Sequence, residues 1–434
     1  MDRLQLEATV GRILADQPVT DLHTHCYPPS FGHSADGTGQ GLLLWGIDEL
    51  VTYHYLIAEV YRVVPASILP YEAFWRMSKL AQADHIWKHL FVERTPVSEA
   101  CRGVLTALKQ LGLDPNERTL EPYRRFFRQQ DVNAYIDRVM ELANVDSITM
   151  TNSVFEDVER RQWLDNPSVG DDPRFAAVLR CDPLLRDWPC ACEKLRQWGY
   201  MADKPLDCES AVNEAKRFVG EWIDRMKAIY VAMSLPPTFC YPSATDNVGQ
   251  NVLERVLLPV LAERGLPLAL MIGSRLRVNP ALDDAGDMCG KADILAVVHL
   301  CDRFPSNRFL VTMLSRENQH ELCVAARKFG NLLPFGCWWF LNNPSIVDEI
   351  TRERVELLGT SFAPQHSDAR ILDQLLYKWD HSRQVIGRVL TDQYARLIAT
   401  GFELTEDHIC RDVRLLMRDN FRHFIEPAPT AVIR

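Results

Sequence analysis

Several features that would place a protein in a membrane or on a nucleic acid are missing from this sequence. No stretch of 18 or more apolar residues occurs, which excludes an ordinary membrane-spanning helix. The N-terminal residues form no apolar run of signal-peptide type, so we expect a cytoplasmic protein. Long runs of Lys or Arg are also missing, and the formal net charge is −10. Both facts argue against a nucleic-acid surface, because such surfaces are strongly basic.

Cysteine spacing of the kind that builds a disulfide framework is missing as well. The chain has 12 cysteines, and Cys190 and Cys192 are separated by one residue instead of the two found in common zinc and redox motifs. We therefore expect free thiols and a reducing compartment. No internal repeat or low-complexity tract is visible. With 47% hydrophobic and 24% charged residues, the 434-residue chain has the composition of a globular enzyme.

Short β-rich runs alternate with helical segments from about residue 143 onward. A first strand ends at His25, and the later runs are 147–151, 175–181, 228–233, 267–272, 308–314, 332–338 and 360–363. Eight strands alternating with helices predict an α/β protein, most economically a (β/α)8 TIM-type barrel. A doubly wound open sheet is the alternative, but no Gly-rich phosphate loop follows the first strand.

The stretch 46–142 has a helical pattern with no strand-like alternation. It is too long for an ordinary loop after a first strand. We predict a helical insertion subdomain over 46–142 that caps the active site, and a barrel made by residues 1–45 and 143–434.

The first predicted strand ends in two histidines, His23 and His25, one residue apart. In a strand, side chains two residues apart point to the same side. Neutral imidazole is a favoured ligand of zinc and neighbouring metals, so the pair suits one metal ion. Two histidines this close also occur by chance, and the pair alone is a weak signal.

Asp368, which follows the last predicted strand, is the candidate third ligand. Active-site groups of barrels lie at the carboxyl ends of the strands, and the first and last strands of a closed barrel are neighbours. Three protein ligands leave an open position, as a catalytic metal requires. A strand-end aspartate can also be a helix N-cap or a turn residue.

Four arginines and two tryptophans also follow predicted strands. They are Arg180, Arg275, Arg316, Arg370, Trp338 and Trp339. Guanidinium groups bind carboxylates in a bidentate way, so the arginines indicate an anionic substrate, although each could pair with a neighbouring carboxylate instead. The tryptophans offer flat apolar walls for a sugar face or could belong to the core.

In their order and spacing, these motifs resemble the uronate isomerase (glucuronate isomerase) family of the amidohydrolase superfamily. The resemblance runs through nearly the whole chain. Its segments are Pro-Val-Thr-Asp-Leu-His-Thr-His at 18–25, His-Tyr at 54–55, Trp-Lys-His-Leu at 87–90, Arg-Cys-Asp at 180–182, Gly-Ser-Arg at 273–275, Phe-Gly-Cys-Trp-Trp-Phe at 335–340 and Ser-Asp-Ala-Arg at 367–370.

The resemblance implies a divalent metal, with zinc as the expected ion, held by His23, His25 and Asp368. Arg370 and Tyr55 would lie over the reacting end of the sugar. Asp368 would accept the ring hydroxyl proton when the pyranose opens. Tyr55, with its pKa lowered by Arg370, would be the base that forms an enediol.

The implied reaction is aldose–ketose isomerisation of a sugar acid: D-glucuronate to D-fructuronate, and D-galacturonate to D-tagaturonate. The predicted substrate-binding residues are Arg180, Asp182, Arg275, Arg316, Trp338, Trp339 and His54. The expected partner is the sugar acid, with no nucleic acid and no membrane, and the expected assembly is a homo-oligomer.

The chain also departs from the family pattern. The family tends to carry a histidine after the fifth strand, where this sequence has Met271 and Ile272. No Lys or Glu stands at the fourth strand to bridge two metals, since Ser234 follows it. A divergent member is therefore expected. The alternatives are a mononuclear metal-dependent hydrolase or lyase of the superfamily, acting on another carboxylated substrate, and a non-catalytic binding protein.

Overall fold

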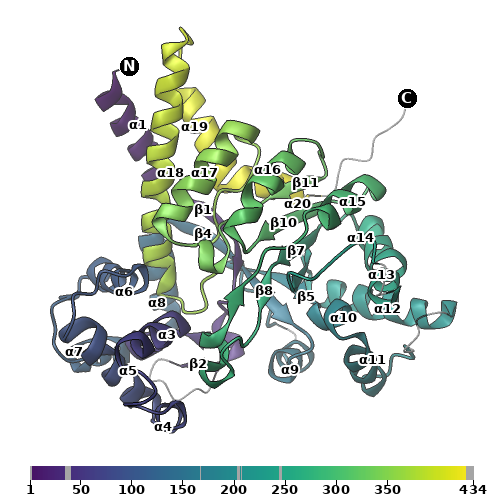
Figure 1. The fold of residues 1–434 in the computed structure, drawn as a ribbon, viewed down its shortest axis with the longest axis horizontal. Helices are drawn as coiled ribbons and strands as arrows, with labels where there is room; N and C mark the ends of the chain where they lie inside the picture. Colours follow the sequence, from purple (N-terminus) through teal and green to yellow (C-terminus); the bar gives the residue numbers. More distant parts are fainter. Residues whose placement is uncertain are drawn as a thin grey trace.

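The computed structural model describes residues 2–34, 41–166, 168–202, 206, 208–243 and 247–426. A curled sheet of seven parallel strands forms its centre, in the order β1-β4-β5-β6-β7-β10-β11 (Figure 1). The strands are β1 (Val19–Thr24), β4 (Val145–Ser153), β5 (Phe175–Arg180), β6 (Val231–Leu235), β7 (Leu268–Ile272), β10 (Phe309–Met313) and β11 (Leu332–Pro334). Two small pairs lie outside it: β2 (His33–Ser34) with β3 (Leu43–Leu44), and β8 (Ser274–Arg275) with β9 (Met288–Cys289).

The sheet is covered on both faces, and this explains why its strands could be predicted. Every residue of β6, β7 and β10 is buried. Parallel strands buried on both faces read as continuous apolar runs, as in the Leu-Ala-Leu-Met-Ile sequence of β7. Seven of the eight predicted strands are confirmed, although β11 ends at Pro334 instead of 338.

The predicted eighth strand at 360–363 is reduced to a single parallel bridge between Phe335 and Ala363. The pairing cannot continue as a regular ladder, because Pro364 has no amide hydrogen to donate and Asp368 has a φ of 51°, outside the β region. The following segment nevertheless pairs with β1. The Asp368 amide donates to the His23 carbonyl (3.2 Å), and the His25 amide donates to the Ala369 carbonyl (2.7 Å). Both edges of the sheet therefore contact the segment 363–369.

Helices surround the sheet. Before β4 the chain forms α1 (Arg3–Asp16), α2 (Ile47–Val51), α3 (His54–Val63), α4 (Tyr71–Trp75), α5 (Lys79–Trp87), α6 (Glu99–Gln110), α7 (Glu121–Arg128) and α8 (Val132–Ala143). After β4 it forms α9 (Asp157–Asp165), α10 (Asp182–Arg186), α11 (Trp188–Gln197), α12 (Glu209–Met226), α13 (Asn247–Asn251), α14 (Leu258–Arg264), α15 (Leu295–Arg303), α16 (Gln319–Ala326), α17 (Pro344–Leu358), α18 (Gln374–Ala399), α19 (Glu406–Arg414) and α20 (Asn420–Ile425). Short helical turns are η1 (Pro29–Phe31), η2 (Lys88–Val92), η3 (Val252–Leu257), η4 (Pro280–Gly286), η5 (Arg316–Asn318), η6 (Trp339–Leu341) and η7 (Leu415–Asp419).

The long helix α18 packs against α1, which precedes the first strand (Figure 1). The start of α1 is fixed by a capping box, in which Asp2 and Gln5 each accept a hydrogen bond from the other's backbone amide. Leu6, Val10 and Ile13 are buried on one face of the helix. The cap thus fixes where the helix begins, and burial of its apolar face stabilises it against the rest of the fold.

All 12 cysteines lie in the described ranges, and none of them forms a disulfide bond, as expected from their spacing. Within the described ranges, no helix is long and apolar enough to cross a membrane. The homo-oligomeric assembly and the cytoplasmic location stay predictions.

Candidate active site

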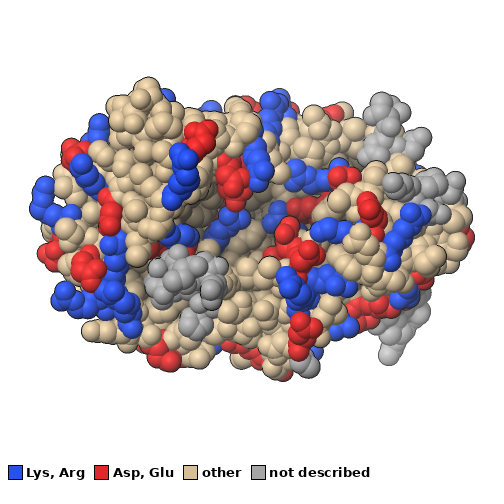
Figure 2. All heavy atoms as spheres, turned by 90° about the horizontal axis from the view of Figure 1, so that it is seen from below, with Lys and Arg blue, Asp and Glu red and all other residues tan. Residues whose placement is uncertain are grey.

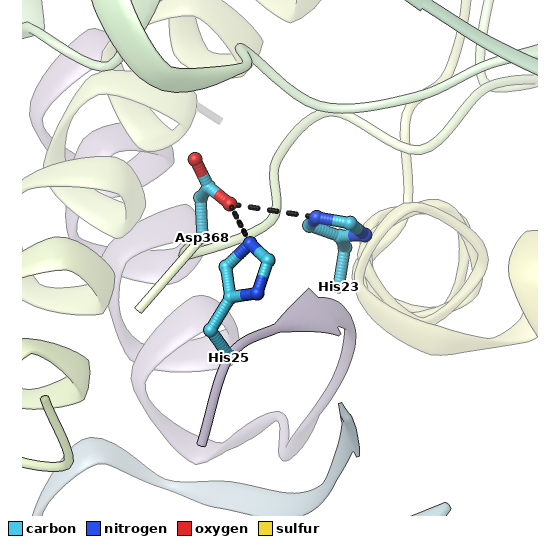
Figure 3. Close-up of side chains that lie close together, drawn as sticks. All are labelled: His23, His25 and Asp368. Carbon is cyan, nitrogen blue, oxygen red and sulfur yellow. Dashed lines mark ion pairs between the residues drawn. The ribbon is translucent and has the colours of Figure 1, made fainter. Parts of the chain in front are cut away.

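Two histidines and one aspartate from opposite ends of the chain meet at the carboxyl end of β1. Nε2 of His23 lies 3.4 Å from Oδ1 of Asp368, and Nε2 of His25 lies 3.5 Å from the same oxygen. Figure 3 shows both imidazoles facing one carboxylate oxygen. The candidate ligand atoms of the three residues all lie within 4.8 Å of one another. The structure thus assembles the set that the sequence predicts.

The three side chains fit a metal ion. His23 is 1% exposed and Asp368 is 7% exposed. Both ring nitrogens of His23 and Oδ1 of Asp368 have no hydrogen-bond partner among the described residues. Buried polar atoms without partners are costly, and a divalent cation between these atoms would satisfy the ones that converge.

The tautomer of His25 is set by its neighbour Thr151. The Thr151 hydroxyl donates to the Thr24 carbonyl (2.9 Å) and lies 3.1 Å from Nδ1 of His25. Because a hydroxyl has one hydrogen, Thr151 accepts the Nδ1 proton of His25, and Nε2 is left unprotonated toward Asp368. Burial lowers the pKa of His25 to about 4, so the ring is a neutral ligand at physiological pH.

Asp21 of β1 anchors the loop that carries Asp368. It is fully buried, and its carboxylate accepts hydrogen bonds from the Ser367 amide (3.1 Å) and from Nε1 of Trp379 (2.8 Å). The side-chain amide of Asn342 donates to the Ser367 carbonyl (3.3 Å). These contacts hold Asp368 in its left-handed conformation, which costs energy for any residue except glycine.

Gly336, just after β11, leaves room for a buried histidine next to the site. Its φ is 64°, and a Cβ atom built there would lie 1.7 Å from Nδ1 of His366. The His366 ring packs edge-on against His23, with 5.3 Å between ring centroids. The glycine of the predicted Phe-Gly-Cys-Trp-Trp-Phe motif therefore has a steric function.

A cavity of about 180 Å³ opens beside the three candidate ligands. It is lined by His23, His25, Tyr53, His54, Arg180, Arg186, Ser234, Met271, Ser274, Leu276, Asp284, Asp287, Trp338, Trp339, Asp368 and Arg370. An adjoining groove shares Arg180 and Arg370 with it and reaches Asp182. Seen from below Figure 1, the surface is hollowed near its centre and charged side chains lie around the hollow (Figure 2).

Most cavity charges are already paired on the chain itself. Nη2 of Arg180 lies 2.8 Å from Oδ2 of Asp182, and Nη1 of Arg370 lies 3.0 Å from Oδ2 of Asp284. For Asp368, burial would raise the pKa of the carboxyl, but contact with the two imidazoles outweighs it and holds the pKa well below the ordinary value. Asp368 is therefore ionised at neutral pH.

Five predicted substrate or catalytic residues that are not metal ligands line the cavity: His54, Arg180, Trp338, Trp339 and Arg370. Nε1 of Trp339 donates to Nε2 of His54 (3.1 Å), so the His54 proton resides on Nδ1. Burial, helped by the charge of Arg370, lowers the pKa of His54 to about 3 and keeps its ring neutral.

The structure corrects the predicted positions of Arg316 and Arg275. The Arg316 side chain is 58% exposed and pairs with Glu349 of α17 (2.9 Å). Arg275 is exposed and lies over Gly290, where a Cβ atom would be 2.5 Å from its Nε. Neither belongs to the described residues that line the cavity. Arg316 thus pairs with a carboxylate of the protein, the alternative to substrate binding that the sequence analysis left open.

Tyr55 also differs from its prediction. Its hydroxyl is buried with no hydrogen-bond partner among the described residues, and it is not part of the cavity lining. Burial, together with Tyr53 and Asp368, raises its pKa well above the ordinary value. The prediction that Arg370 lowers this pKa is wrong, and the phenol stays protonated at neutral pH.

Sequence reasoning missed several cavity residues, above all Tyr53, Arg186, Asp284 and Asp287. Tyr53 stands next to the predicted His-Tyr pair, and Arg186 ends the short helix after β5. Asp284 and Asp287 belong to the segment that follows β7 and β8. The rule that loops after barrel strands carry the site could have pointed to all four.

The chain is similar to three solved structures over nearly its whole length. A uronate isomerase from Bacillus halodurans C-125 is 51% identical, with 98% of this chain and 97% of that chain covered and a TM-score of 0.92. A uronate isomerase from Thermotoga maritima (13% identity, 97% of each chain, TM-score 0.73) and a glucuronate isomerase from Caulobacter crescentus (15% identity, 99% and 95%, TM-score 0.73) share the fold. No protein-family model matches the chain, and no curated protein matches it.

Proposed function

The chain belongs to the uronate isomerase family, and we propose that it converts D-glucuronate to D-fructuronate and D-galacturonate to D-tagaturonate. The observation that carries this assignment is the buried cluster of His23, His25 and Asp368, which opens on a cavity lined by arginines. Isomerisation of a uronate fits such a site, because one end of the sugar must exchange protons while the other end carries a carboxylate. The hydrolase, lyase and binding-protein alternatives have no comparable support.

We propose that His23, His25 and Asp368 hold a divalent metal, with zinc first among the candidates. The support is the donor set: one imidazole with a free Nε2, a second imidazole with unpartnered nitrogens and a carboxylate oxygen without a hydrogen bond. When bound, such an ion would polarise a sugar oxygen as a Lewis acid. A single-metal site agrees with the side chain of Ser234, which offers no bridging carboxylate.

The protein's own side chains can move the protons. Isomerisation shifts a hydrogen from C2 to C1 of the open-chain sugar through an enediol. Asp368 is ionised, and one of its oxygens points away from the imidazoles, free to accept the ring hydroxyl proton (Figure 3). Tyr55 is protonated and without a partner, so it begins as a donor. General acid–base catalysis needs an ionised acceptor and a protonated donor, and Tyr55 would have to reach the sugar from outside the present cavity lining.

We propose that the sheet functions as a closed (β/α)8 barrel, with residues 46–142 as a cap. Support for closure comes from the backbone hydrogen bonds of Asp368 and Ala369 to β1. Support for the cap comes from Tyr53 and His54, which reach the cavity from this region, and from Nε1 of Trp75, which donates to the Ala281 carbonyl (2.9 Å).

Proton NMR in deuterium oxide tests the reaction. We expect the purified protein to convert D-glucuronate or D-galacturonate to the corresponding ketose and to incorporate solvent deuterium at carbon. The same incubation with D-glucose is the control, and we expect no ketose from it. If neither uronate yields ketose or exchange while the protein is folded and loaded with zinc, the proposed activity is wrong.

Metal analysis tests the ligand set. We expect about one zinc per chain in the wild-type protein, and a fall in zinc affinity of at least about 100-fold in His25→Ala, because losing a direct ligand costs more than losing an outer partner. His320→Ala is the matched control, since His320 is exposed, pairs with Glu353 and lies outside the cavity lining. Equal zinc content in His25→Ala and His320→Ala after dialysis would contradict the assignment.

A further inference from the structure

Two backbone carbonyl groups in the loop that carries Asp368 depend on a single side chain. They belong to His366 and Ser367, both of which are fully buried. The side-chain amide of Asn342 donates to these carbonyls, at 3.4 and 3.3 Å. Buried carbonyls without a donor lower stability, so the direction of this one amide bears on the position of the loop.

The direction of the neighbouring Gln365 amide is fixed by the backbone. Its Oε1 accepts hydrogen bonds from the amides of Cys337 (2.8 Å) and His366 (3.1 Å). Since a backbone amide only donates, the Gln365 oxygen must face these two groups and its nitrogen must face the other way. Nε2 of Gln365 then donates to Oδ1 of Asn342 (3.2 Å) and to the Ser382 hydroxyl (3.3 Å). The side chain of Asn342 therefore presents its oxygen to Gln365 and its nitrogen to the loop.

His381 of α18 provides a second donor to the same oxygen. Its Nε2 lies 3.1 Å from Oδ1 of Asn342. Because this atom of Asn342 is an oxygen, the proton of the neutral His381 ring resides on Nε2. Burial, together with the charge of Lys378, lowers the pKa of His381 to about 3, so the ring is neutral at physiological pH.

The contacts of His381 make Asn342 its route to the site. His381 is not among the described residues that line the cavity, so it does not touch a sugar bound there. Its Nδ1 lies 3.9 Å from Oε1 of Glu99 on α6, beyond hydrogen-bond distance. Among the described residues, the bond from Nε2 to Asn342 is the one hydrogen bond of the ring. A change at His381 would thus reach Asp368 through Asn342 and the loop carbonyls.

We propose that His381 is a positioning residue for the candidate metal ligand Asp368. This inference rests on the proposed metal site. The donor of His381 keeps the Asn342 amide turned so that both of its N–H groups face the loop. The loop in turn holds Asp368 at a φ of 51°, where its carboxylate faces His23 and His25. A conformation of this kind persists only where the surrounding contacts over-determine it.

Zinc affinity, measured by competition with a chelator, tests the proposal without relying on turnover. We expect His381→Leu, which keeps the bulk and removes the donor, to lower zinc affinity by about 10-fold, as for other outer partners of metal ligands. His381→Gln should stay within about threefold of wild type, because its side-chain amide can donate to Asn342 in place of Nε2. Recovery by glutamine identifies the hydrogen bond, and not the bulk of the ring, as the cause.

Val385, one turn further along α18, provides the matched control. It is 1% exposed and packs in an apolar cluster. Val385→Ala leaves a cavity, so its thermal midpoint should fall by a few degrees. Its zinc affinity should match wild type, because no hydrogen bond to Asn342 is lost. The comparison separates a weakened α18 from a misplaced Asp368.

The outcomes distinguish the role of His381 from the metal site itself. If wild type binds zinc and His381→Leu binds it equally well, His381 has no positioning role while the metal site stands. An equal fall in zinc affinity in His381→Leu and Val385→Ala also overturns the role, because it reflects a general loosening of the helix. A loss that His381→Gln does not recover contradicts it as well. If wild type binds no zinc, the proposed metal site fails and the inference fails with it.

Discussion

Asp368→Asn is expected to lower kcat for D-glucuronate by at least about 1000-fold, within the range that general acid–base groups contribute. The substitution keeps the shape of the side chain and removes its ability to accept a proton. It also removes the negative charge that faces His23 and His25 at 3.4 and 3.5 Å. The loss should appear in kcat and kcat/KM alike, because the carboxylate acts on the reacting end of the sugar.

The variant should still fold, so a loss of activity can be attributed to the carboxylate and not to unfolding. Asp368 has a φ of 51°, and asparagine is among the few residues that tolerate this region as well as aspartate does. Asp283→Asn is a matched control, since Asp283 has a φ of 52° but is exposed and lies outside the cavity lining. We expect both variants to have the wild-type thermal midpoint within a few degrees. More than a tenth of wild-type turnover in Asp368→Asn would contradict the proton-acceptor role.

Most of the sheet could be predicted because of its burial. Parallel strands covered on both faces leave continuous apolar runs, as in β7, and seven of the predicted β-rich runs became strands of the sheet. The run at 360–363 did not, because Pro364 and the left-handed Asp368 interrupt the pairing after Ala363. The residue types of a segment favour a strand, but whether the segment forms a ladder depends on its backbone partners.

The candidate ligands could be predicted because their chemistry is local. Two histidines at strand spacing and an aspartate after the last strand are visible without a structure. Ion pairing is not visible in this way. Arg316 forms an ion pair with Glu349, which lies 33 residues further along the chain on another helix. Arg186, in contrast, lines the cavity. A strand-end arginine becomes a substrate residue only if no carboxylate of the fold reaches it first.

The choice between Tyr53 and Tyr55 depends on how the chain enters α3. Tyr53 is the N-cap of α3 and has an extended backbone, whereas Tyr55 is the second residue of this helix. The two rings pack edge-on, with 5.0 Å between ring centroids, so both phenols lie close together. A His-Tyr motif therefore does not identify which phenol faces the cavity, and the structure places Tyr53 there.

The proton-donor role of Tyr55 rests on the cost of its unpartnered hydroxyl. A buried polar group without a hydrogen bond lowers stability, and the Tyr55 ring could pack equally well without it against Tyr53 and Phe340. The Tyr53 side chain is different, because it lines the cavity. We therefore expect the Tyr55 hydroxyl to be retained for contact with the substrate.

Tyr55→Phe should separate activity from stability. We expect kcat to fall by about 100-fold, while the free energy of unfolding stays equal or rises by about 1 kcal/mol because an unsatisfied group is removed. Tyr53→Phe, the matched variant, should keep the free energy of unfolding within about 1 kcal/mol of wild type and retain more activity. Chemical denaturation and steady-state kinetics on both variants measure the two effects. A larger loss of kcat in Tyr53→Phe than in Tyr55→Phe would transfer the donor role to the phenol that lines the cavity.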